Sequence, residues 1–183
     1  MEDKRRFIID CALTELRENG FAAFSQLKVA KRAGLRQSHL TYYYPTRVDL
    51  LLAVAEAAME RQLAMLDGLL ASAPKKQAPE QMAMLLGRKD NARVLLALVQ
   101  GADEEPRLQA QFVDFAAKMR ERAGALLPAG KQRKALATDV YLLHALSVGL
   151  AVLGLALDHA DGGDKYNADV MKRAIRMLGA EPG

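Results

Sequence analysis

Three consecutive tyrosines, at residues 42–44, stand beside positively charged side chains. They are three of the five tyrosines in the chain, and Arg36, His39 and Arg47 flank them. A phenol can pack its rigid ring on the protein and donate its hydroxyl to a phosphate oxygen, with less loss of side-chain entropy than a lysine. The run therefore indicates either contacts to nucleic-acid phosphates or ordinary aromatic packing at the rim of a core.

Basic residues are concentrated in the same part of the chain. The net charge of the 183 residues is only +4, but residues 1–50 hold nine Lys or Arg against six Asp or Glu, whereas residues 51–183 hold seventeen against sixteen. No acidic residue occurs between Glu18 and Asp49. A positive face of this size is often plain solvated surface, so charge alone does not identify a polyanionic partner.

The composition is that of a globular protein. With 51% hydrophobic residues the chain can bury a sizeable core, and its length suits one domain or a small domain joined to a larger one. Cys11 is the only cysteine, and the N-terminus lacks the pattern of a signal peptide. We therefore expect a cytoplasmic protein.

Apolar residues recur at helical spacing, and no segment alternates with the period of a β-strand. This pattern predicts an all-α protein. The expected helices cover about 4–19, 25–33, 37–44, 46–72, 79–87, 91–101, 104–127, 131–157 and the segment after 167, with a linker at 71–79.

Individual residues mark the expected helix ends. Gly20 suits the left-handed position after the first helix, and Gly34 suits a tight turn between the second and third. Pro45 stops the third helix, and Thr46 with Asp49 forms a capping box for the next one. The other predicted N-caps are Ser25, Asp90 and Asn167.

Three short helices with a glycine-centred turn, on a basic background, describe a helix-turn-helix unit whose third helix can enter the major groove of DNA. On that helix Leu40 and Tyr44 lie four residues apart and can hold it on the core. Gln37 and Ser38 lie on the other side, where Gln can pair with adenine through two hydrogen bonds.

At these residues the sequence resembles the TetR family of bacterial repressors. The resemblance rests on Val29-Ala30, Ala33-Gly34-Leu35 and the stretch from Leu40 to Leu50, and it covers about residues 5–54. It implies a helix-turn-helix DNA-binding domain at residues 1–48, followed at 49–183 by a larger helical ligand-binding and dimerisation bundle. It also implies base contacts from Gln37, Ser38 and His39.

The same resemblance implies phosphate contacts, although four positions depart from the family pattern. Thr41 replaces the first tyrosine, so Tyr42 is expected to supply that contact; Tyr44 replaces a phenylalanine, Arg47 a lysine and Arg36 a capping Ser or Thr. We also expect Lys28 to reach a phosphate, because it lies near the start of the second helix. The predicted phosphate contacts are Lys28, Thr41, Tyr42, Tyr43 and Arg47.

Residues 140–157 contain no Asp, Glu, Lys or Arg and one histidine, His144, and they just meet the length of a membrane-spanning helix. Their many small residues, and the absence of a Lys, Arg or Trp anchor nearby on the C-terminal side, favour a helix covered by its own bundle and a second subunit over membrane insertion. The resemblance implies a homodimer in which the last two helices of each protomer pair. The predicted interface residues are Ala145, Gly149, Val152, Ala156, Met171 and Ile175.

Several large apolar residues in the middle of the chain form either a filled core or a ligand cavity, and methionines suit adaptable cavity walls. The resemblance favours a pocket for a small-molecule inducer, whose identity the sequence does not specify. The predicted pocket residues are Met82, Leu85, Leu95, Leu98, Phe112, Phe115 and Met119.

Nothing in the sequence indicates an enzyme, a metal site or a cofactor. The three histidines lack the spacing of metal ligands, and no glycine-rich phosphate loop follows a strand. The cluster of Asp158, His159, Asp161 and Asp164 is better explained as a solvated helix end than as a cation site. We expect a dimeric, ligand-responsive DNA-binding regulator, most consistent with a repressor; the alternative is a protein that sequesters a small molecule without binding DNA.

Overall fold

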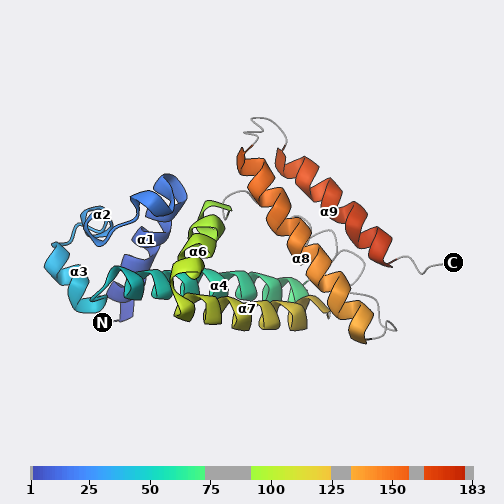
Figure 1. The fold of residues 1–183 in the computed structure, drawn as a ribbon, viewed down its shortest axis with the longest axis horizontal. Helices are drawn as coiled ribbons and strands as arrows, with labels where there is room; N and C mark the ends of the chain where they lie inside the picture. The colour runs from blue at the N-terminus through green and yellow to red at the C-terminus, as the bar shows by residue number, and fades with distance from the viewer. Residues whose placement is uncertain (1, 73–91, 125–132, 157–162, 180–183) are drawn as a thin grey trace. The chain divides into compact units, whose positions relative to one another are not determined.

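The computed structural model describes residues 2–72, 92–124, 133–156 and 163–179. Within these ranges every regular element is a helix, as the sequence predicts (Figure 1). The helices are α1 (Glu2–Ala23), α2 (Gln26–Arg32), α3 (Gln37–Tyr43), α4 (Arg47–Ser72), α6 (Ala92–Glu104), α7 (Pro106–Gly124), α8 (Arg133–Ala156) and α9 (Gly163–Gly179). The protein is all-α. Most of the expected linker, and the helix expected at 79–87, lie outside the described residues.

The first helix is interrupted at the predicted glycine. Gly20 has φ +71° and ψ −178°, a conformation that other residues rarely adopt, and a short helical turn follows it to Ala23. Ile8, Ala12 and Leu16 are fully buried on one face of α1, as their spacing predicts.

The second helix has the predicted caps at both ends. The Ser25 hydroxyl accepts a hydrogen bond from an amide in the first turn of α2, at 3.3 Å. At the other end the Leu35 amide donates to the Ala30 carbonyl (2.9 Å) and the Gly34 amide to the Lys31 carbonyl (3.2 Å). These two bonds form a Schellman motif, which the φ of +65° at Gly34 permits.

The third helix is fixed more firmly at its end than at its start. Arg36 precedes it and provides no side-chain cap for its first amides. The helix stops at Tyr44, immediately before Pro45, as predicted. There the Gln26 side-chain amide donates to the Tyr44 carbonyl at 2.6 Å, which ties the end of α3 to the start of α2.

The fourth helix begins with the predicted capping box. The Asp49 amide donates to the Thr46 hydroxyl at 3.0 Å, and the Thr46 amide donates to the Asp49 carboxylate at 3.0 Å. The Thr46 hydroxyl also donates to the Asp49 carboxylate, at 2.7 Å. This bond and the one from the Thr46 amide lower the pKa of Asp49, and the Arg107 guanidinium, 3.9 Å from the carboxylate, acts in the same direction.

Residue contacts divide the chain into two compact units. The first unit is Met1–Arg61 with Arg93–Asp114, and the second is Gln62–Ala92 with Phe115–Gly183. In the first unit α6 approaches its neighbours closely at Gly101, where a Cβ atom would lie 2.8 Å from the Leu51 side chain. The division at residue 48 into two functional domains remains a prediction.

In the second unit α8 and α9 pack on each other through apolar side chains. Val140, Leu143 and Leu150 of α8 form a buried cluster with Met171 and Ile175 of α9. Met171 and Ile175 are 0% and 6% exposed, so they belong to the core of their own chain. Their predicted contact with a second protomer therefore remains a prediction, and within their own chain they pack against α8.

The predicted start of the last helix is wrong. α9 begins at Gly163, and Asn167 lies inside it rather than at its N-cap. Asn167 is 2% exposed, and its side-chain amide donates to the Leu150 carbonyl at 3.5 Å. The amide thus joins α9 to α8, a tertiary role that overrides the preference of Asn for helix starts.

Candidate DNA-binding surface

α3 buries one side and presents a polar side to solvent. Leu40 is 0% exposed and Tyr44 6%, whereas Gln37, Ser38 and His39 are all exposed. The side chains expected to read bases are therefore accessible, and the helix that carries them is anchored. Their contact with DNA remains a prediction.

The three tyrosines differ in environment. Tyr44 is a core residue, and its burial raises the pKa of its hydroxyl, which nearby Arg5 opposes. Tyr42 is 75% exposed and lies edge-on to the half-buried Tyr43, with ring centroids 5.2 Å apart. Both roles that the run suggested are thus available: one ring packs in the core, and the other two lie at the surface.

Lys28 and Thr41, the other predicted phosphate contacts on α2 and α3, differ in how available their donor groups are. Lys28 is exposed. The half-buried Thr41 donates its hydroxyl hydrogen to the Ser38 carbonyl at 3.1 Å. Because a phosphate oxygen needs a donor, Thr41 must break this bond to contact one.

Arg47 fastens the start of α4 to the end of α1. Its Nε donates to the Phe24 carbonyl at 3.2 Å and its Nη2 to the Phe21 carbonyl at 3.4 Å. The guanidinium also lies 4.4 Å from the centroid of the Phe21 ring, a cation–π contact. Arg47 therefore positions the helix-turn-helix unit, and its predicted phosphate contact must coexist with these bonds.

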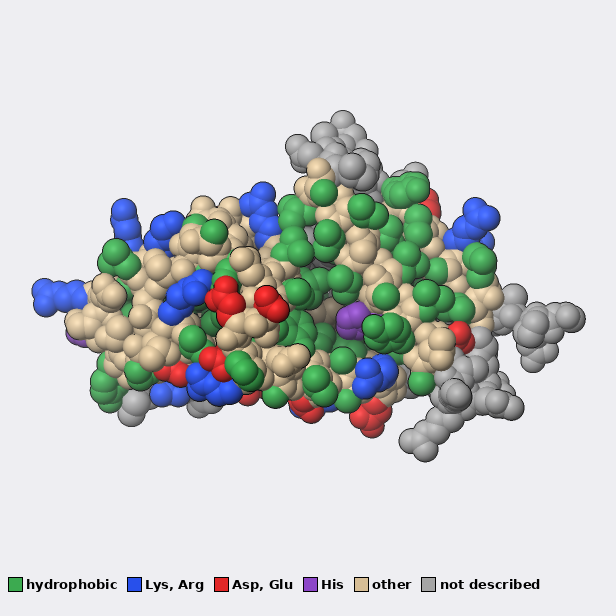
Figure 2. Space-filling model, viewed as in Figure 1, with side chains coloured by type: hydrophobic (Ala, Val, Ile, Leu, Met, Phe, Trp, Pro, Cys, Tyr) green, Lys and Arg blue, Asp and Glu red, His purple; other side chains and the backbone are tan. Residues whose placement is uncertain are grey.

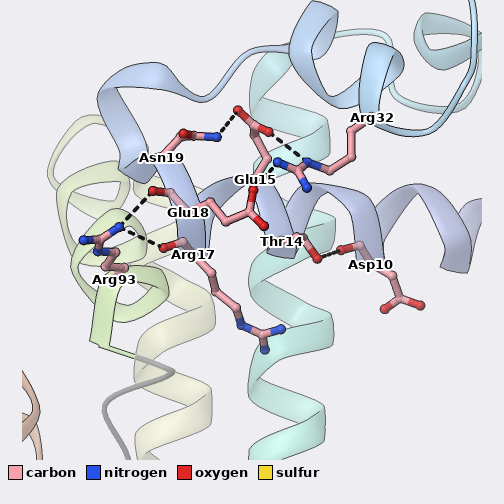
Figure 3. Close-up of polar contacts among 8 residues, drawn as sticks. All are labelled: Asp10, Thr14, Glu15, Arg17, Glu18, Asn19, Arg32 and Arg93. Carbon is pink, nitrogen blue, oxygen red and sulfur yellow. Dashed lines mark hydrogen bonds and ion pairs between the residues drawn. The ribbon is translucent and has the colours of Figure 1, made fainter.

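A cluster of polar side chains joins α1 to α2 (Figure 3). Arg32 Nε donates to the Glu15 carboxylate at 2.9 Å, and its Nη2 pairs with Glu18. Asn19 donates to the other Glu15 oxygen at 2.8 Å. Glu15 is only 4% exposed, and the hydrogen bonds to Glu18 and Glu15 raise the pKa of Arg32.

This cluster reduces the basic charge that is available to a partner. The charge of Arg32 is balanced within the protein, while Lys28, Lys31 and Arg36 remain exposed. We did not predict this cluster from the sequence. The signal in the sequence was the spacing of Glu15 and Glu18, which places two carboxylates on one side of α1. The segment that follows contains Lys and Arg but no Asp or Glu up to Asp49.

Arg93 of α6 holds the end of the regular part of α1 (Figure 3). Its Nη1 donates to the carbonyls of Arg17 at 3.3 Å and Glu18 at 2.8 Å. Because Gly20 interrupts the helix, carbonyls just before it lack their usual partners along the helix. Arg93 satisfies two of them from a different helix.

The predicted ligand-pocket residues fall in both units. Leu98, Phe115 and Met119 are buried, and Leu95 and Phe112 are half-buried. Leu95, Leu98 and Phe112 belong to the first unit, whereas Phe115 and Met119 belong to the second. Met82 and Leu85 lie outside the described residues, so the pocket remains a prediction.

One side of α8 is apolar and accessible. The predicted interface residues Ala145 and Ala156 are exposed, and Gly149 and Val152 are half-buried. Their spacing of four, three and four residues places them on one side of the helix. Large apolar neighbours on α8 and α9 are exposed as well: Tyr141 67%, Leu142 52%, Leu153 55%, Tyr166 64% and Met177 70%.

Hydrophobic side chains accordingly gather over α8 and α9 in Figure 2. The segment Ala137–Ala156 has a mean hydropathy of 1.7, and 33% of it is buried. In the described part of the chain it is the one helix that could cross a membrane by length and composition. A core helix of a soluble protein has the same properties.

The described residues offer no group of three or more His, Cys, Asp or Glu side chains that could hold a metal ion. Residues 158–161, which include most of the acidic cluster noted in the sequence, lie outside the described ranges. His144 is half-buried on α8, and its burial, together with nearby Arg120, lowers its pKa.

Comparison with known proteins connects this geometry to a family. Residues 8–54, which span most of α1, α2, α3 and the start of α4, match the family model described as bacterial regulatory proteins, tetR family. No curated protein sequence matches the chain.

Solved structures with the same fold cover almost the entire chain. A TetR transcription regulator from Haloarcula marismortui superposes with a TM-score of 0.81 at 17% identity, covering 97% of this chain and 98% of its own. A transcriptional regulator from Rhodococcus sp. Rha1 gives 0.85 at 20% identity, with 97% and 99% covered. A protein from Saccharomonospora viridis described as a transcriptional regulator in complex with choline gives 0.79 at 15% identity, with 96% and 97% covered.

Proposed function

We propose that this chain is a regulator of the TetR family, whose model its residues 8–54 match, and that it binds a pseudo-palindromic DNA operator as a homodimer and is released by a small-molecule inducer. Occupancy of an operator is enough to block transcription, so the proposed role is that of a repressor.

The observation that carries the proposal is the two-sided character of α3. Gln37, Ser38 and His39 are exposed, while Leu40 on the same helix is fully buried. A recognition helix needs this combination, because its base-reading side chains must enter the major groove while the helix keeps a fixed direction.

Base and phosphate contacts have separate roles in the proposal. Gln37 is suited to adenine, and Ser38 and His39 to neighbouring base edges. The exposed hydroxyl of Tyr42 and the charge of Lys28 are suited to phosphates, together with Tyr43 and Arg47. Phosphate contacts set the register of the protein on the duplex and carry no sequence information themselves.

The proposed dimer uses the accessible apolar side of α8. Ala145, Gly149, Val152 and Ala156 lack bulk, so a second helix can approach closely there. Exposed patches of this kind mark interaction sites in soluble proteins. In a two-fold dimer the two α3 helices would meet half-sites about 34–36 Å apart, or a multiple of that distance.

The inducer is proposed to bind among the predicted apolar pocket residues. The choline complex of the Saccharomonospora protein supports a small-molecule site in this fold, and it does not identify the ligand of this chain. Such a ligand releases DNA only if it binds more tightly to the dimer arrangement in which the two α3 helices do not match the half-sites of the operator.

Selection of bound sequences from a random DNA pool tests the proposal directly. A palindromic consensus is expected, and affinity for it should fall steeply as salt rises, with a log–log slope of about 0.9 per neutralised phosphate. A pool without enrichment, and binding that is insensitive to salt, would favour the alternative of a sequestering protein.

Variants then test the division of roles. Gln37→Ala should lose preference for the consensus over random DNA, whereas Tyr43→Phe should weaken binding to both alike. Arg173→Ala, at an exposed position on α9, serves as the control. Arg47→Ala is less informative, since it also removes the bonds to Phe21 and Phe24.

A further inference from the structure

A cavity lies in the first unit between the end of α1 and the start of α6. Its volume is about 370 Å³, which is within the ~300–1,000 Å³ range of small-molecule sites. It contains none of the residues predicted for the inducer pocket or for DNA contact. Its lining residues are Glu18, Asn19, Gly20 and Phe21 from α1 and Arg93, Leu96, Ala97 and Gln100 from α6.

Arg93 provides an anion-binding group at this cavity. The Glu18 carboxylate is held by Arg32, which it shares with Glu15. The hydrogen bonds of Arg93 go to two backbone carbonyls, and no carboxylate of the described residues pairs with it. Its Nε and Nη2 atoms donate to none of the described residues, and this edge of a guanidinium can bind a carboxylate through two parallel hydrogen bonds.

The remaining wall combines apolar surface with one amide. Leu96 is 39% exposed beside the buried Phe21 and Ala97, and the exposed Gln100 can donate a further hydrogen bond. We propose that this cavity binds a small organic carboxylate, with its charged end on Arg93 and its apolar body against Leu96 and Phe21.

The location of the site connects it to the unit that contains α3, the helix proposed to read bases. A carboxylate on Arg93 would compete with the carbonyls of Arg17 and Glu18 for the same guanidinium. Glu18 also pairs with Arg32 of α2, so a change at the end of α1 reaches the helix-turn-helix unit through one residue (Figure 3). This regulatory consequence rests on the proposed function, whereas the binding itself does not.

Calorimetric titration of the full-length protein, without DNA, tests the binding with 1-naphthoate as the probe and 1-naphthamide as its neutral analogue. Saturable binding of naphthoate is expected, with naphthamide at least about tenfold weaker because it lacks the charge that Arg93 recognises. Arg93→Gln should weaken naphthoate binding at least about tenfold, and Arg93→Lys less. Arg173→Gln, on α9, should leave it unchanged.

A second variant keeps the test independent of the structural bonds of Arg93. Gln100→Trp places a large ring in the cavity without touching those bonds, and it should abolish naphthoate binding while the thermal midpoint stays near that of the wild type. Equal binding of the two probes, no saturable binding, or naphthoate binding that survives Gln100→Trp would each overturn the proposal. If no operator is found but naphthoate binding depends on Arg93, the DNA-binding proposal fails and this one stands.

Discussion

α3 and α8 both bury one side and expose the other, but their exposed sides differ in chemistry. α3 presents Gln37, Ser38 and His39, which water solvates well, whereas α8 presents Ala145, Val152 and other apolar side chains. A polar side is stable without a partner, while an exposed apolar side gains free energy whenever it is covered. This difference suggests that α3 can bind and release its partner, whereas the apolar side of α8 stays covered by a partner.

Leu40→Ala should have the largest effect, because it removes the fully buried anchor of α3. We expect a loss of roughly 2–5 kcal/mol in the free energy of unfolding, measured by urea denaturation. Tyr42→Ala is the control: at this 75% exposed position the free energy of unfolding should change by no more than ~0.5 kcal/mol, while DNA affinity falls. Similar unfolding curves for the two variants would contradict the two-sided description of α3.

Ala145→Arg tests the apolar side of α8. A charge at the centre of a buried interface should raise the dimer dissociation constant by about a hundredfold, or ~2.7 kcal/mol, as measured by analytical ultracentrifugation. Glu121→Arg, at an exposed position on α7, should leave the dimer intact. An unchanged dimer in the Ala145 variant would mean that another surface forms the interface.

A pair of glycines tests how tightly α6 packs. A Cβ at Gly101 would lie 2.8 Å from Leu51 and 3.0 Å from Leu108, so Gly101→Ala should cost about 1–3 kcal/mol of packing, partly offset by the better helix propensity of alanine. A Cβ at Gly68 would meet no atom within 4 Å, and Gly68→Ala should stabilise by up to ~1 kcal/mol. Thermal unfolding midpoints that move in the same direction for both variants would contradict the close approach at Gly101.

The smallest expected effect is a pH dependence at the start of α4. The pKa of Asp49 is lowered by the Thr46 hydrogen bonds and by Arg107, so its contribution to stability is present above the unfolded pKa of about 3.9 and is lost as pH falls through the lower folded value. Asp49→Asn should therefore be less stable than the wild type at pH 7 and similar to it near pH 2. A constant difference across this range would show that the charge of Asp49 has no part in the cap.

Helix ends were predictable from sequence because their causes are local. Gly20, Gly34 and the Thr46–Asp49 pair each act within a few residues. The structure has Gly34 and the capping box as predicted, and Gly20 has the expected positive φ, although α1 continues past it to Ala23. The helix-turn-helix segment was predictable for the same reason, because its motif is continuous in the chain.

The contacts that were missed join residues far apart in the sequence. Arg32 meets Glu15 across 17 residues, and Arg93 meets Glu18 across 75. The packing of Met171 and Ile175 against α8 was missed too, since periodicity shows that a helix has an apolar side without showing whether the same chain or a partner covers it.

Three residues connect α3 to α4, and each of them is constrained. Tyr44 is buried, the ring of Pro45 restricts its own backbone, and Thr46 is held in the capping box. Rotation of the backbone at this joint is consequently restricted. A rotation of α4 should therefore change the direction of the polar side of α3, so the proposed recognition of DNA would depend on a helix that itself carries none of the side chains predicted to read bases.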